Sequence, residues 1–112
     1  MIYRGTTPTF VIDVTDLDLT GWDIYVTFEQ KKYEFTVSDC EVIATDTGCR
    51  VEVELTQEQT LGFKGSDEGV PAAVQVRAYK DGKAEATSKF MFDVFEISLD
   101  GEIPVSGGDG GG

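Results

Sequence analysis

The sequence predicts an all-β fold, an antiparallel immunoglobulin-like β-sandwich of about seven strands with one short helical turn. Apolar and polar residues alternate through most of the chain, whereas apolar residues at helical spacing are nearly absent. Turn signals recur about every 8 to 12 residues, which is the spacing of a sandwich. The 112 residues are enough for one hydrophobic core. We therefore expect a single domain over residues 1–103 and a flexible Gly-rich tail over residues 104–112.

Each expected strand carries apolar residues at every second position. The clearest case places Val51, Val53 and Leu55 on the core side, with charged residues between them on the solvent side. Asp81 and Gly82 are typical of a two-residue hairpin turn that needs positive φ angles. The expected strands span residues 9–14, 24–29, 33–37, 42–44, 49–53, 72–80 and 89–99.

The last strand contains an irregularity in its alternation. Phe90, Phe92 and Val94 share one parity, whereas Phe95 and the apolar residues after it share the other. A β-bulge near residues 93–95 would reconcile the two halves, because a bulge inserts one extra residue into a strand. A strand that is buried on both faces explains the pattern equally well.

One segment breaks the β pattern and predicts a single helical turn at residues 56–61. Thr56 and Gln59 have the spacing of a capping box, in which each side chain satisfies a backbone amide at the start of a helix. The turn is expected to end near Gly62 or Gly65. Leu61 and Phe63 would then cover one end of the sandwich.

The two cysteines are predicted to remain free thiols. A hairpin around residues 45–48 places Ala44 opposite Cys49 and Cys40 opposite Val53. The cysteines are then on the order of 13 Å apart along the strands, whereas a disulfide needs Cα atoms within about 7 Å. Free thiols also agree with synthesis in a reducing cytoplasm, which we expect because the first eight residues lack the features of a secretion signal.

The charge balance excludes several classes of partner. Nine Lys and Arg against 21 Asp and Glu give a net charge of −12, which repels nucleic acids and anionic membranes. The sequence contains no histidine, which removes Ser-His-Asp and Cys-His nucleophiles and the usual zinc sites. We therefore expect a protein that is not an enzyme, binds no cofactor, and has neither nucleic acid nor membrane as a partner.

An acidic cluster near the first turn is a candidate calcium site. Asp13, Asp16, Asp18 and Asp23 could supply some of the oxygen ligands that calcium requires. Their spacing fits no EF-hand loop, because the glycine and the terminal glutamate of that motif are absent. We therefore interpret the cluster as a solvated turn and expect no metal.

Four aromatic residues could form a platform for sugar rings. Trp22, Tyr25, Tyr33 and Tyr79 are the candidates, with Trp22, Tyr25 and Tyr79 as the core of the platform. This is the basis of an alternative function as a carbohydrate- or receptor-binding module. In a sandwich, however, aromatic residues line the core by default, and Trp22 at a strand entrance would close one end.

The N-terminal segment has two interpretations. Ile2 and Tyr3 precede any strand signal, and Pro8 favours an extended chain. The segment is either an arm that binds a partner through Ile2, Tyr3, Arg4 and Pro8, or an ordinary first edge strand of the same sandwich.

Four segments carry a resemblance to a known family. They are MIYRGTTPT at residues 1–9, SDCE at 38–41, VELTQEQTL at 53–61 and ISLDGEI at 97–103. In these segments the chain resembles short β-sandwich structural proteins encoded in tail and baseplate modules of phages and prophages of gut Firmicutes, similar to the N-terminal domain of baseplate upper proteins. The resemblance implies a structural protein located in the virion and made in the host cytoplasm. Its partners would be other phage structural proteins, with self-association in a symmetric assembly as an alternative.

Overall fold

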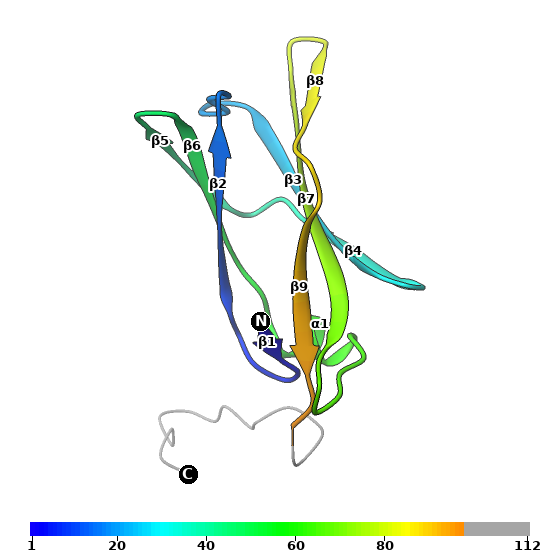
Figure 1. Ribbon diagram of the computed structural model, residues 1–112. Coiled ribbons are helices and arrows are strands. Elements are labelled where there is room, and N and C mark those ends of the chain that lie inside the picture. Colours follow the sequence, from blue (N-terminus) through cyan, green and yellow to red (C-terminus); the bar gives the residue numbers. More distant parts are fainter. Residues whose placement is uncertain (98–112) are drawn as a thin grey trace, which may run out of the picture.

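A computed structural model describes residues 1–97, which form two β-sheets packed face to face (Figure 1). The predicted tail at residues 104–112 and the end of the predicted last strand lie outside the described residues. In chain order the elements are β1 (Ile2–Tyr3), β2 (Thr9–Thr15), β3 (Asp23–Gln30), β4 (Tyr33–Val37), β5 (Glu41–Thr45), β6 (Gly48–Glu54), α1 (Gln57–Leu61), β7 (Val70–Lys80), β8 (Lys83–Ala86) and β9 (Phe90–Phe95).

The strand order confirms the predicted sandwich. The larger sheet has the order β1-β9-β7-β3-β4, with β8 paired to β7, and the smaller sheet has the order β2-β6-β5. With β2 as strand B, the smaller sheet has the immunoglobulin order B-E-D and the larger one the order G-F-C-C′. Strand A of that fold would cover the outer edge of β2. Here the first strand, β1, lies instead on the opposite sheet, next to β9.

Two strands were not expected from the alternation, and one of them changes the description of the fold. These are β1 and β8, of two and four residues. β1 pairs parallel with β9, through Ile2 opposite Val94 and Tyr3 opposite Phe95. The other strand pairs of the sandwich are antiparallel as predicted, and this two-residue edge pairing is parallel.

The core lies between the sheets and is rich in phenylalanine. Phe28 on β3 is fully buried, and its ring lies 5.0 Å from that of Phe10 and 5.1 Å from that of Phe35, measured between centroids. Phe10 comes from the smaller sheet, so its contact with Phe28 joins the two layers. Phe92 extends the cluster, with its ring 4.9 Å from Phe10. Edge-on and offset ring contacts of this kind stabilise a core beyond the area that they bury.

A β-bulge is present in the last strand region, but not where the alternation placed it. Arg77 pairs with Ala86, and Val74 pairs with Phe90. The two pairs are three residues apart on β7 but four residues apart on the segment from β8 to β9. One extra residue is therefore inserted between β8 and β9. Thr87 anchors the insertion, since its hydroxyl accepts a hydrogen bond from the Val76 amide at 3.1 Å.

Neither interpretation of residues 93–95 is correct. Pairing of β9 with β7 runs without interruption from Phe90 to Val94, so there is no bulge in that stretch. Met91 and Asp93 are exposed, so the strand is not buried on both faces. β9 ends at Phe95, whose ring instead lies 5.6 Å from that of Tyr3 on β1. The change of parity therefore marks the end of the strand.

The predicted helical turn is confirmed as α1, at the end of the sandwich that also holds β1 (Figure 1). Thr56 caps it, accepting a hydrogen bond from the Gln59 amide, while the Gln59 side chain accepts one from the Thr56 amide. Phe63 is fully buried and closes this end as expected, whereas Leu61 is only half-buried. Within residues 1–97 no helix is long and apolar enough to cross a membrane.

Candidate functional site

The structure places the N-terminal segment on the sandwich as an edge strand. Ile2 is only 5% exposed and belongs to the core, so it is not available to a partner in this structure. Tyr3 points to the other side and is 46% exposed. Of the two interpretations of this segment, the first edge strand is the one observed, and the prediction that Ile2 serves as a free arm is corrected.

Arg4 fastens this segment to the end of α1. Its Nε donates to the carbonyl oxygen of Phe63 at 2.7 Å, and its Nη2 donates to that of Leu61 at 2.8 Å. Its Nη1 lies 2.7 Å from Oε1 of Glu96, and the hydrogen bond from Arg4 holds the pKa of that carboxyl below its ordinary value. The last turn of α1 has no basic residue of its own. The positive charge of Arg4, near the N-terminus of the chain, thus interacts favourably with the partial negative charge at the C-terminal end of α1.

Pro8 also forms a contact within the chain. Its carbonyl oxygen accepts a hydrogen bond from the Leu55 amide at 3.0 Å, which extends the ladder between β2 and β6. Nearby, the buried hydroxyl of Thr60 donates to the carbonyl oxygen of Thr6 at 2.8 Å. Of the four residues predicted to bind a partner, Tyr3 is the one that keeps a largely exposed side chain.

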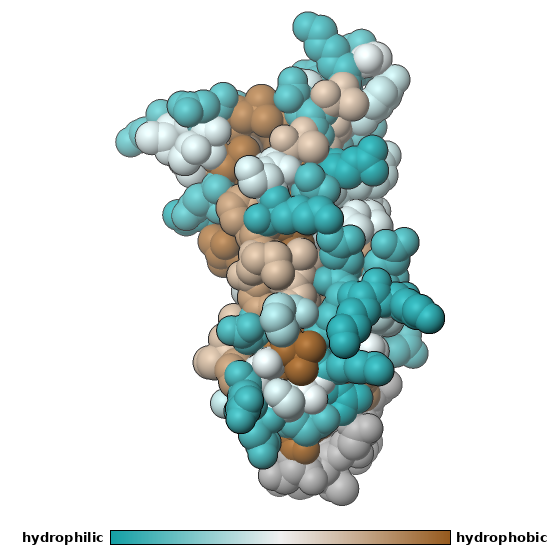
Figure 2. Space-filling view, turned by 45° about the vertical axis from the view of Figure 1, so that its right-hand side comes forward, coloured by the Kyte–Doolittle hydropathy of each residue, from teal (hydrophilic) through white to brown (hydrophobic). Residues whose placement is uncertain are grey.

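One side of the sandwich leaves two strand edges open among residues 1–97. The outer edge of β2 has no paired strand there, and β1 covers β9 only at Val94 and Phe95. Exposed apolar side chains accompany both edges, namely Val11 on β2 (54% exposed), with Phe90 and Met91 on β9. Figure 2 shows apolar surface along the length of the molecule, flanked by hydrophilic side chains. The outer edge of β2, with the unpaired part of β9, is called the open side below.

The aromatic platform is assembled only in part. Tyr25 and Tyr79 lie on the outer face of the larger sheet, where Tyr25 pairs with Arg77 and Tyr79 pairs with Asp23. The two tyrosines line a depression of about 320 Å³ together with Arg77. Trp22 does not join them, because it packs against the core. Tyr33 is likewise turned inward, with its ring 5.2 Å from that of Phe63.

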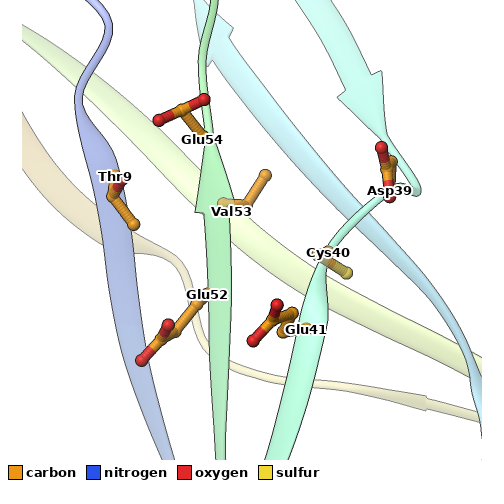
Figure 3. A pocket seen from close by; sticks show the side chains of 7 residues that line it. All are labelled: Thr9, Asp39, Cys40, Glu41, Glu52, Val53 and Glu54. Carbon is orange, nitrogen blue, oxygen red and sulfur yellow. The ribbon is translucent and has the colours of Figure 1, made fainter.

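The outer face of the smaller sheet carries an acidic depression of about 300 Å³ (Figure 3). Glu41 on β5 and Glu52 on β6 are directly opposite each other, so two like charges face one another across the strands. Figure 3 shows Thr9 on β2 and Glu54 further along β6, both beside the same depression. The full lining is Thr9, Asp39, Cys40, Glu41, Glu52, Val53 and Glu54.

The candidate calcium residues are dispersed into separate interactions. Asp13 forms an ion pair with Arg50 at 3.1 Å, and Asp18 accepts hydrogen bonds from the amide and the hydroxyl of Thr20. These hydrogen bonds lower the pKa of Asp18. Asp16 occupies a left-handed turn position with a φ of 63°. Within the described part of the chain, no group of three or more His, Cys, Asp or Glu is placed to hold a metal ion.

The predicted hairpin register and free thiols are confirmed. Ala44 pairs with Cys49, and both cysteines are free. Cys49 is buried in the core, whereas Cys40 is half-buried at the acidic depression. Burial raises the pKa of the Cys40 thiol, and the neighbouring charge of Asp39 raises it further. A raised pKa lowers the thiolate fraction, so Cys40 is a poor nucleophile here.

A basic pocket at the β3–β4 turn was not predicted from the sequence. It has a volume of about 440 Å³, and Lys31, Lys32 and Lys64 are among the residues that line it. A signal was present in the sequence, since Lys31 and Lys32 occupy a hairpin turn where Asn and Gly are favoured. Lys64 is more than 30 residues away, and nothing in the local pattern brings it to this turn.

No protein-family model matches this chain, and comparison with curated proteins and with solved structures gives no significant match.

Proposed function

We propose that this chain is a structural protein of a phage virion, in the tail, the baseplate or another part of the particle. Its partners are other phage structural proteins, and it reaches the particle after synthesis in the host cytoplasm. The four segments that resemble tail-module proteins support this proposal, as does the β-sandwich that the resemblance implies. A structural role requires contacts that are repeated in every copy, and the open side offers such a contact.

The observation that carries this proposal is the outer edge of β2. Its backbone has no paired strand among residues 1–97, and Val11 beside it is 54% exposed. An unpaired edge is a template for a strand of another chain, with main-chain hydrogen bonds for affinity and side-chain pockets for specificity. We infer that a neighbouring virion protein adds an extended segment here, in the place that strand A holds in related sandwiches.

Particle incorporation of two matched variants tests this assignment. Val11→Asp places a charge at the proposed contact, and Ile43→Asp places one on β5, at the opposite edge of the same sheet. Both residues are exposed in the isolated chain, so both variants should fold. Burying an unpaired carboxylate costs more than about 1.4 kcal/mol, so Val11→Asp should reduce incorporation about tenfold or more.

The readout is the amount of the chain in purified particles, measured by quantitative mass spectrometry. Ile43→Asp should incorporate like the wild type. Equal incorporation of both variants would place the contact elsewhere, and absence of the wild-type chain from purified particles would refute the virion assignment.

A second function, glycan or receptor binding, is favoured by the depression between Tyr25 and Tyr79. Two exposed tyrosines with Arg77 in the same depression combine a stacking surface with hydrogen-bond donors, which sugar rings require. Glycan-array binding that is lost in Tyr25→Ala and Tyr79→Ala, and retained in Tyr3→Ala, would support this function. An array without signal for the wild-type chain would dismiss it.

A further inference from the structure

We propose that the pocket beside the β3–β4 turn binds a carboxylate-rich segment of a partner chain through Lys31, Lys32 and Lys64. The pocket measures about 440 Å³ and is lined by Gln30, Lys31, Lys32, Tyr33, Gly62, Lys64 and Val70. It is next to β4, at the edge of the larger sheet opposite β1. This inference goes beyond the proposed function, which uses the open side. Separate experiments test the proposed function and the pocket.

The charge distribution is the first argument. The chain has nine cationic side chains against 21 acidic ones, and three of the nine line this pocket. No Asp or Glu is among the residues that line it. A concave surface that gathers charges of one sign focuses their field, so the pocket attracts anions although the whole chain repels them.

The pocket has a fixed floor. Gln30 is only 5% exposed, and both ends of its side-chain amide bind the backbone of Lys64. Nε2 donates to the Lys64 carbonyl oxygen at 2.8 Å, and Oε1 accepts from the Lys64 amide at 2.6 Å. The Tyr33 hydroxyl donates to the carbonyl oxygen of Gln59 at 2.8 Å. These bonds hold the segment that carries Lys64 beside the turn that carries Lys31 and Lys32, so the three lysines line one pocket before any ligand binds.

The backbone of the turn is the second argument. Lys31 has a φ of 51°, in the left-handed region that side-chain-bearing residues avoid. Of the two other two-residue hairpins among residues 1–97, the one between β5 and β6 has no positive φ at its turn. The one between β7 and β8 has Asp81 and Gly82 there, a pair suited to positive φ. At the β3–β4 turn the chain instead has two lysines. A strained residue in place of a favoured one indicates that its side chain has a role.

The chemistry of the pocket selects a short acidic peptide as its ligand. Each of the three ammonium groups is a point charge with several donors, and each can pair with one carboxylate of an acidic segment. Val70 and the ring of Tyr33 offer apolar surface to the methylene groups of a glutamate side chain. A long polyanion such as a nucleic acid would meet the repulsion of the remaining surface, since the net charge is −12.

The test uses the full chain and a fluorescein-labelled peptide of six glutamates, followed by fluorescence anisotropy at low salt. The triple variant of Lys31, Lys32 and Lys64 to Gln should bind about tenfold more weakly than the wild type. The matched control replaces Arg77, Lys80 and Lys83 by Gln, because it removes the same charge from β7 and β8 at the other end of the larger sheet. This control should stay within about twofold of the wild type. Circular dichroism confirms that both variants are folded.

Three results would overturn the proposal. The first is the absence of binding to the wild-type chain at millimolar peptide. The second is an equal loss of affinity in the control variant, which would show that only net charge matters. The third is tighter binding of a single-stranded oligonucleotide of equal charge, which would make the pocket a phosphate site. A six-glutamine peptide, which should not bind, controls for contacts that need no carboxylate.

Discussion

The side chain of Gln30 and the backbone of Lys64 form a pair of hydrogen bonds that joins β3 to the segment after α1. The donor–acceptor distances are 2.8 Å from Nε2 to the Lys64 carbonyl oxygen and 2.6 Å from the Lys64 amide to Oε1. Gln30 is one of the few buried polar side chains, and no buried side-chain nitrogen or oxygen in the described residues lacks a partner. The pair therefore places a polar residue in the core without leaving an unsatisfied group.

Replacing Gln30 by Met should destabilise the fold. Methionine has a similar shape but cannot bind the Lys64 backbone, so two partly buried hydrogen bonds are lost at a cost of about 1–3 kcal/mol. Urea denaturation measures this change, with the exposed Glu68→Gln as the control that should alter stability by less than about 0.5 kcal/mol. Equal stability of Gln30→Met and the wild type would mean that water satisfies both groups.

Stability should depend on pH through the pair formed by Arg4 and Glu96. The hydrogen bond from Arg4 holds the pKa of Glu96 below its ordinary value of 4.5. A carboxyl with a lowered pKa stabilises the fold above its unfolded-state pKa, and this contribution disappears as the pH falls through the folded-state value. The stability difference between the wild type and Glu96→Gln should therefore be larger at about pH 7 than at about pH 3. A carbon NMR titration of Glu96 checks the direction of the shift, and a midpoint above 4.5 would contradict it.

Reversing the charge of Glu41 should stabilise the protein. Glu41 faces Glu52 directly across β5 and β6, and like charges in that position repel. Glu41→Lys replaces this repulsion by attraction and should raise the free energy of unfolding by about 0.2–1 kcal/mol, more at low salt. Glu85→Lys makes the same change in net charge opposite Ala78 and is the control. An equal gain in both variants would show that the relief of net charge, and not the cross-strand pair, is responsible.

Glycine at position 31 should relieve the strained β3–β4 turn. Lys31 has a φ of 51°, and glycine adopts such angles at no steric cost. Lys31→Gly should raise stability by up to about 1 kcal/mol, whereas Lys32→Gly, at a residue without positive φ, should not. Thermal denaturation compares the two variants. A larger gain for Lys32→Gly would contradict the assignment of strain to Lys31.

The two thiols should differ in reactivity and should both be reduced. Thiol counting in denaturant without reductant should recover two groups per chain, since both cysteines are free. In the folded protein a disulfide reagent should modify Cys40 before the buried Cys49, and its rate should rise steeply with pH because burial raises the pKa of Cys40. Cys40→Ser identifies which thiol reacts first. Recovery of no thiols from monomeric protein would contradict the hairpin register.

Local patterns were sufficient to predict most strands and the helix start. Ile24, Val26 and Phe28 are all buried on β3 as their alternation indicated, because the direction of side chains in a strand depends only on the local backbone. The capping box of Thr56 and Gln59 spans three residues, so it too is readable without the fold. The hairpin register followed from the position of one turn, and with it the separation of the two thiols.

The fate of the N-terminal segment was not predictable in this way. A strand of two residues has too few positions to display alternation, and β1 pairs with residues more than 90 positions away. The partners of Arg4 are separated from it by 57 to 92 residues. The bulge was misplaced for a related reason: the inserted residue falls among the half-buried to exposed residues 87–89, where parity has no visible consequence.

By itself, then, the sequence determined the β-sandwich, the helical turn and the free thiols, because periodicity and turn chemistry are local properties. Tertiary structure alone decided which surfaces remain open. It moved Ile2 into the core, separated Trp22 from Tyr25 and Tyr79, and left the outer edge of β2 without a paired strand among residues 1–97. It also brought Lys64 to the β3–β4 turn through Gln30. Such proximities arise from packing between distant segments, which no local pattern of residues encodes.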